Sequence, residues 1–161
     1  MKRRSFIAFT FLLISIGGIT IGWSNWSGKM YEYNHSDFSK QIEGLPFEAK
    51  VPTKVPFEKT NVSSSNFDFE KHEIVVTLTN LHKETLEVRI SGKEIEYKKG
   101  FEEESVRLGD ELQGVFFSDG SGKRILTWQD NDLNYEITYY YKLTPKEVSK
   151  EQLIKMAESF E

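Results

Sequence analysis

The sequence predicts an α+β domain that follows a single N-terminal transmembrane helix. Three features carry this prediction. Residues 5–23 hold no charge, the chain from residue 66 onward alternates apolar and polar side chains with period two, and residues 149–160 show helical spacing. Period-two alternation is typical of strands with one buried face, whereas i, i+4, i+7 spacing is typical of an amphipathic helix. Each element buries its apolar face against the other, which is the α+β arrangement.

The N-terminal segment has the length and the flanks of a membrane anchor. Three basic residues, 2–4, precede 19 uncharged residues, 5–23. A helix of that length covers about 28 Å, close to the hydrocarbon thickness of a bilayer. Basic residues before a span hold the N-terminus in the cytoplasm, and Trp23 and Trp26 stand where interfacial aromatic residues are expected. The segment therefore predicts a single-pass protein tethered through residues 5–23.

A cleaved signal peptide is the alternative to a permanent anchor. Its cleavage site would be small-x-small, and the nearest candidate, residues 20–22, fits this pattern poorly. Two glycines at 17–18 weaken a helix, so a cleaved, secreted form remains the alternative. We expect residues 1–28 to be a membrane anchor, or an uncleaved signal, and residues 29–161 to form an extracytoplasmic domain.

The composition of the predicted extracytoplasmic domain excludes several classes of function. Residues 29–161 carry 18 Lys and Arg against 25 Asp and Glu, a net charge of −7, since residues 1–28 remove three basic residues and no acidic ones. Nucleic acids and anionic lipid surfaces are bound through basic faces, so neither is an expected partner. The chain has no cysteine, which excludes disulfides, thiol catalysis and thiolate metal sites.

The first elements of this domain are a short helix and an extended ribbon. Ser36 is the expected N-cap of the helix, Phe38 and Ile42 share its apolar face, and Gly44 ends it. Residues 45–57 then contain three prolines, each followed or preceded by large apolar residues. Proline removes an amide donor, so this run is expected to be an extended ribbon that inserts side chains while it wraps an edge of the sheet.

Seven segments with period-two alternation predict an antiparallel meander of about six to seven strands. The predicted strands are residues 72–79, 84–91, 93–98, 104–108, 111–118, 124–129 and 133–143. The short connections between them are rich in Asn, Asp and Gly, residue types that tolerate positive φ in tight turns.

The chain is expected to end in an amphipathic helix packed on one face of this sheet. Ser149 and Gln152 form a capping box, in which each side chain bonds to the backbone amide of the other residue. Val148 and Leu153 flank the box as a hydrophobic staple, and the apolar face continues to Phe160.

Parts of the chain resemble a bacterial family of extracytoplasmic domains of unknown function, the family numbered 4367 among such domains. The resemblance lies in residues 45–57, Trp128, residues 135–137 and residues 151–160, and it covers most of the predicted domain. It implies an extracytoplasmic location in a Gram-positive bacterium, with tethering by one N-terminal helix. These motifs are structural, so the resemblance implies no catalytic residue.

No residue pattern in the sequence predicts catalysis, a cofactor or a metal site. The three histidines, His35, His72 and His82, lack the spacing of a zinc site. The acidic run at residues 102–104 and the turn at residues 130–132 lack the ligand pattern of a calcium loop. We therefore expect a protein that is not an enzyme.

Aromatic residues on three successive predicted strands are the feature that suggests binding. One interpretation places them in the core beneath the C-terminal helix, because aromatic residues are favoured in strands. The other places Phe116, Trp128 and Tyr140 on the opposite, uncovered face, where they would bind a peptide or a lipid chain. The predicted function is a membrane-tethered binding or sensing domain for an envelope protein, peptide or lipid. A structural or assembly subunit of a membrane complex is the alternative.

Overall fold

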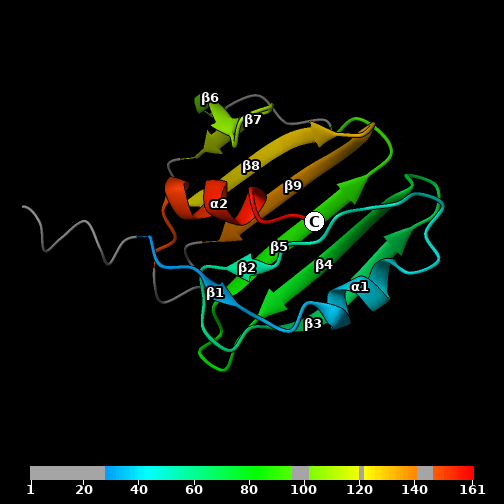
Figure 1. Ribbon diagram of the computed structural model, residues 1–161, viewed down its shortest axis with the longest axis horizontal. Helices are drawn as coiled ribbons and strands as arrows, with labels where there is room; N and C mark the ends of the chain where they lie inside the picture. The colour runs from blue at the N-terminus through cyan, green and yellow to red at the C-terminus, as the bar shows by residue number, and fades with distance from the viewer. Residues whose placement is uncertain (1–27, 96–101, 120–121, 141–146) are drawn as a thin grey trace, which may run out of the picture.

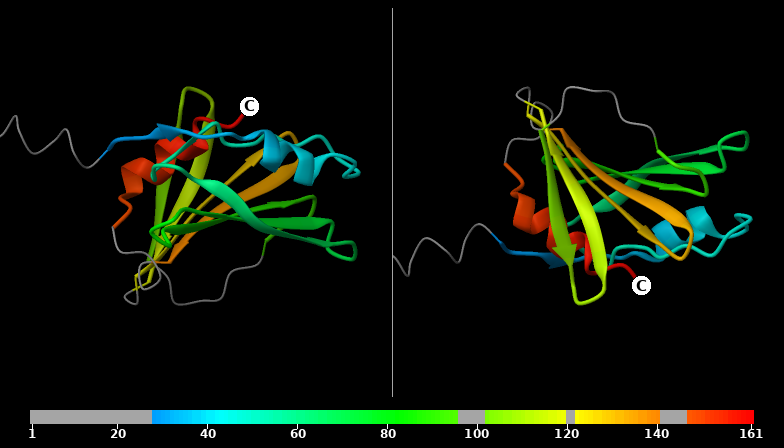
Figure 2. Two further views of the ribbon diagram at one scale, coloured as in Figure 1. Left: turned by 90° about the horizontal axis from the view of Figure 1, so that it is seen from below. Right: turned by 90° about the horizontal axis from the view of Figure 1, so that it is seen from above.

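The computed structural model of this chain describes residues 28–95, 102–119, 122–140 and 147–161. Seven strands form one antiparallel sheet in the order β3-β4-β5-β9-β8-β7-β6 (Figure 1). A two-stranded ladder, β1-β2, and two short helices lie together on one side of this sheet (Figure 2). The predicted α+β class and the antiparallel sheet are confirmed.

The first meander of the sheet consists of β3 (Asn61–Asp68), β4 (Glu73–Thr79) and β5 (Thr85–Ser91). Every second residue of β4 and β5 is a fully buried Ile, Val or Leu, which confirms these two predicted strands. β3 was not predicted, because serines 63–65 break the alternation of apolar residues. Most of its side chains are exposed, and its pairing with β4 shifts register between Val62 and Ser64.

The second meander consists of β6 (Glu102–Leu108), β7 (Leu112–Ser118), β8 (Lys123–Asp130) and β9 (Leu133–Tyr140). Asn131 and Asp132 have φ values of 49° and 65° and form the two-residue turn between β8 and β9. β9 pairs with β5 and so joins the two meanders. The strand order therefore departs from the chain order at this one pairing, since the chain passes from β5 to the far edge of the sheet at β6.

One face of the sheet carries the main core, and we call it the inner face; the opposite face is the outer face. α1 (Ser36–Ile42) inserts Phe38 into this core, and α2 (Lys150–Ala157) inserts Leu153 and Met156. Both helices lie on the inner side (Figure 2). The sheet contributes apolar side chains from six of its strands, which are Ile74, Val76, Leu78, Leu86, Val88, Ile90, Val106, Leu108, Phe116, Leu126, Trp128, Leu133, Tyr135, Ile137 and Tyr139.

The helix ends agree with the sequence prediction for α2 and differ by one residue for α1. Ser149 Oγ accepts a hydrogen bond from the Gln152 amide at 3.2 Å, and Gln152 Oε1 accepts one from the Ser149 amide at 3.2 Å. The predicted capping box is thus confirmed. In α1 the N-cap is His35, not Ser36, because the first helical hydrogen bond runs from the Ser39 amide to the His35 carbonyl at 2.9 Å. The Ser36 side chain instead donates to Asn34 Oδ1 at 2.7 Å.

The proline-containing ribbon is extended and inserts side chains into the core, as predicted. β2 (Lys54–Val55) pairs with β1 (Tyr31–Glu32), and Val51, Val55 and Phe57 are buried. The ribbon also pairs with the end of the chain. The Val51 amide donates to the Glu161 carbonyl at 3.0 Å, and the Glu161 amide donates to the Val51 carbonyl at 3.1 Å.

Some predicted features lie wholly or partly outside the described residues. Residues 5–23, the predicted membrane span, are among them. Within the described ranges, no helix has the length and apolar character needed to cross a bilayer. The predicted strand at residues 93–98 is not formed in its described part, 93–95, and its remainder lies outside the described residues.

Candidate functional site

The three aromatic residues predicted to share an uncovered face do not share one. Phe116 pairs with Leu126, which in turn pairs with Ile137, so Phe116 lies on the inner face and is only 8% exposed. Trp128 pairs with Tyr135 on the same face and is 5% exposed. Tyr140 follows Tyr139 on an alternating strand and therefore points to the outer face.

The physical reason for this difference is the register of the β8–β9 hairpin. Its two-residue turn pairs Asp130 with Leu133 and thereby places Trp128 opposite Tyr135. Side chains opposite each other in an antiparallel pair share a face. A two-residue turn at residues 131–132 places Trp128 on the same face of the sheet as Tyr135. Tyr140 is an odd number of residues from Tyr135 on the same strand, so it lies on the opposite face.

Trp128 and Tyr135 form an aromatic cluster with Phe160 in the core. The rings of Trp128 and Tyr135 are stacked at 5.2 Å and 8°, and Phe160 meets them edge-on at 5.0 Å and 5.6 Å. The Tyr135 hydroxyl accepts a hydrogen bond from the Lys50 amide at 3.2 Å. Burial raises the pKa of Tyr135. These contacts confirm the core interpretation for Trp128 and Tyr135, beneath the C-terminal segment of the chain.

The outer face carries a network of ionisable side chains at the junction of β4, β5 and β9. Arg89 lies between Glu73 and Glu136, with nitrogen–oxygen distances of 3.8 Å and 4.0 Å. Its Nε is buried and has no hydrogen-bond partner within the described structure. The Tyr140 hydroxyl donates to Glu87 Oε2 at 2.9 Å. Burial, together with this hydrogen bond, raises the pKa of Tyr140 to about 12, so its phenol stays protonated at neutral pH.

The segment that leaves the predicted membrane anchor is held by α2. Lys155 Nζ donates to the Gly28 carbonyl at 3.0 Å, and the Gln152 side-chain amide donates to the Lys29 carbonyl at 3.1 Å. Gln152 is itself 9% exposed and also belongs to the capping box of α2. The start of the described chain is therefore fixed to the fold by two hydrogen bonds, in addition to the β1–β2 ladder.

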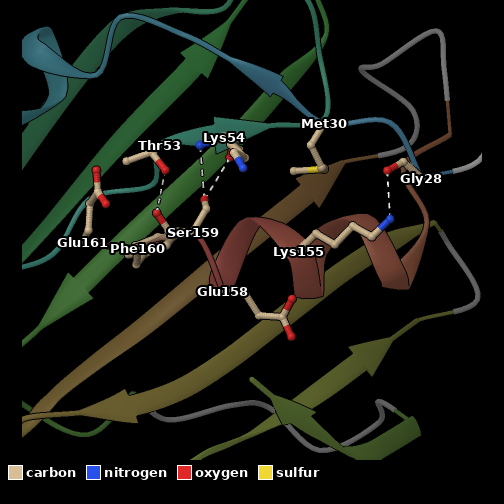
Figure 3. Close-up of a pocket in the computed structure, with 9 residues that line it drawn as sticks. All are labelled: Gly28, Met30, Thr53, Lys54, Lys155, Glu158, Ser159, Phe160 and Glu161. Carbon is tan, nitrogen blue, oxygen red and sulfur yellow. Dashed lines mark hydrogen bonds between the residues drawn. The ribbon is translucent and has the colours of Figure 1, made fainter. Parts of the chain in front are cut away.

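A pocket of about 510 Å³ opens where this segment, β2 and the end of the chain meet (Figure 3). The Thr53 amide donates to the Ser159 carbonyl at 3.1 Å, and the Lys54 amide donates to Ser159 Oγ at 3.2 Å. Figure 3 shows Lys155 at one end of the pocket and Glu161 at the other, with Lys54 between them. The pocket is lined by Gly28, Met30, Thr53, Lys54, Lys155, Glu158, Ser159, Phe160 and Glu161.

The histidines and acids of the described residues form no metal-binding group of three or more side chains. His72 and His82 precede and follow β4, so they lie at opposite ends of that strand. Both are exposed.

The comparisons with known proteins identify no relative. The chain matches no protein-family model, no curated protein and no solved structure. Its resemblance to the family of extracytoplasmic domains of unknown function therefore stays a prediction.

Proposed function

We propose that this chain is a non-enzymatic, membrane-tethered extracytoplasmic domain that binds or senses a component of the cell envelope. The observation that carries the proposal is the attachment of residues 28–32 to the fold. Gly28 and Lys29 are hydrogen-bonded to α2, and Tyr31 and Glu32 pair with β2. A free linker would have no such contacts. The described part of the fold thus begins five residues after Trp23, the predicted membrane interface.

This attachment supports a domain held at a set position above the bilayer. Five residues of extended chain span at most about 17 Å. The linker between Trp23 and Gly28 therefore keeps the pocket next to Gly28 within that distance of the predicted interface. A binding domain held so close to the membrane samples the headgroup layer and its immediate surroundings.

The outer face of the sheet is the surface that we propose for an envelope protein or peptide. Arg89, Glu87 and Tyr140 present hydrogen-bonding groups there, and the helices lie on the other side (Figure 2). Charged and polar groups of this kind confer specificity and orientation on a protein interface more than raw affinity.

An assembly subunit is the second candidate, and one observation favours it. Phe116 and Trp128 are buried in the core, so they form no exposed aromatic groove for a ligand. Native mass spectrometry of the chain extracted from its membrane separates the two candidates. A stoichiometric partner protein supports assembly, whereas a monomer with a bound small molecule supports sensing.

Topology can be tested with single-cysteine variants, because the natural chain has no cysteine. Ser63→Cys places a thiol on the exposed strand β3, and Lys2→Cys places one before the predicted span. In intact cells a membrane-impermeant maleimide should label only Ser63→Cys, and lysis should expose Lys2→Cys. Protection of Ser63→Cys in intact cells would contradict the proposed orientation. Release of the labelled domain into the medium would support the cleaved, secreted form instead.

A further inference from the structure

We propose that the pocket beside Gly28 binds the headgroup of an ethanolamine phospholipid in the membrane to which the chain is tethered. This inference rests on the tether proposed above. Its basis is the charge of the pocket wall, which holds two lysines and two glutamates, Lys54, Lys155, Glu158 and Glu161. No ion pair among the described residues joins any of these four side chains to another.

Among the described residues, the pocket wall holds two positive and two negative side chains that do not pair with each other. Such a wall is complementary to a ligand that carries both a positive and a negative charge. Ion pairs between exposed side chains contribute little to stability, so leaving these charges unpaired costs the fold little and keeps them available to a ligand. Here Lys155 lies at one end of the pocket and Glu161 at the other (Figure 3). Lysines do not outnumber glutamates in this wall, so it favours a zwitterionic ligand over an anionic one.

The two lysines provide the phosphate side of the site. Each ammonium has three donors, and Lys155 uses one of them on the Gly28 carbonyl. Lys54 Nζ makes no hydrogen bond within the described structure, although its backbone is fixed by Ser159 and by pairing with Glu32. Hydrogen bonds between an ammonium and a phosphate are charge-assisted and about twice as strong as neutral ones.

The two glutamates provide the ammonium side. Glu158 Oε1 accepts a hydrogen bond from the Gly109 amide at 2.9 Å, which leaves Oε2 for a ligand. The Glu161 side chain has no partner among the described residues. A primary ammonium donates three hydrogen bonds, whereas the quaternary ammonium of choline donates none. The site should therefore distinguish ethanolamine from choline lipids, and a glycerol headgroup lacks the cation altogether.

Position and size agree with this ligand. The pocket volume of about 510 Å³ lies in the range of small-ligand sites, roughly 300–1,000 Å³. Gly28 lines the pocket and is five residues from Trp23, so an extended linker keeps the pocket within about 17 Å of the predicted interface. Met30 and Phe160 add apolar surface for the glycerol end of the lipid.

Amide hydrogen exchange of the full chain in nanodiscs tests this proposal. Three lipid compositions are compared: phosphatidylcholine alone, and the same lipid with phosphatidylethanolamine or with phosphatidylglycerol. We expect the amides of Thr53 and Lys54, which bond to Ser159, to exchange at least about fivefold more slowly with phosphatidylethanolamine only. Lys54→Met and Glu161→Gln should each remove this effect, whereas Lys40→Met, an exposed lysine on α1, should leave it unchanged.

The possible outcomes separate this proposal from the tether on which it rests. Equal exchange in all three compositions, with residues 5–23 protected by lipid, would overturn the headgroup site and leave the tether in place. Slower exchange with phosphatidylglycerol would overturn it in favour of a general anion site. Free exchange of residues 5–23 in every nanodisc would refute the tether itself.

Discussion

Phe160 is expected to stabilise the domain by joining the end of the described chain to the aromatic cluster of the core. It meets Trp128 and Tyr135 edge-on and forms a bridge with Pro52 on the ribbon. Replacement of a fully buried Phe by Ala costs about 3–5 kcal/mol. Because Phe160 is half-buried, we expect Phe160→Ala to lower the free energy of unfolding by about 2–3 kcal/mol. About 0.5–1.5 kcal/mol of this loss comes from each aromatic contact.

Urea unfolding of residues 28–161 measures this loss directly. All residues of the described core lie in this range, and Trp128 is its only tryptophan, so its fluorescence reports on the cluster. With an m value of about 2 kcal/mol/M, in the middle of the usual range for a small domain, the midpoint should fall by about 1–1.5 M. Circular dichroism on the same samples checks that the two transitions coincide.

Phe69→Ala is the matched control, since it removes the same atoms from a ring that is 79% exposed. Surface substitutions usually change stability by less than about 0.5 kcal/mol. If the two variants lose the same stability, the end of the chain does not close the core and the reasoning from the aromatic cluster is refuted.

Three further substitutions, one of them with a matched control, test other parts of the structure by urea midpoints. The pKa of Tyr140, about 12 in the fold, exceeds the value of about 10 in the unfolded chain, so its contribution to stability is present below pH 10 and is lost as the pH rises towards 12. Tyr140→Phe should therefore lose less stability than the natural chain between pH 10 and 12; parallel pH profiles would argue against this. Ser149→Ala should cost about 1 kcal/mol by removing the cap of α2, whereas Ser36→Ala, which caps nothing, should cost less than about 0.5 kcal/mol. Gly114→Ala should cost about 1–3 kcal/mol, because the new Cβ would lie 2.7 Å from the carbonyl oxygen of Thr127; a neutral result would mean that β7 and β8 can separate locally.

The local elements were predictable from the sequence because their signals are local. Ile74, Val76 and Leu78 alternate with polar residues on β4, and the side chains of Ser149 and Gln152 cap α2. β3 was not predicted because its serines interrupt the alternation of apolar and polar residues. It is a strand only because it pairs with β4.

The pairing of β5 with β9 could not be predicted in the same way. Leu86 and Tyr139 lie more than fifty residues apart, and alternation defines the face of a strand but not its neighbour. The candidate site was missed for a related reason. The pocket is built from residues near both ends of the chain, and the spacing of Lys54 and Lys155 contains no sign that they share a pocket.

The pairing of residues 51–53 with residues 159–161 has a consequence for how the protein is made. The ribbon leaves the ribosome about a hundred residues before its partner, so the core stays open during most of synthesis. Contacts between such distant segments form slowly, because the closure of a long loop must precede them. The pairing of Val51 with Glu161 therefore forms late, and the core closes only after residues 159–161 have been made.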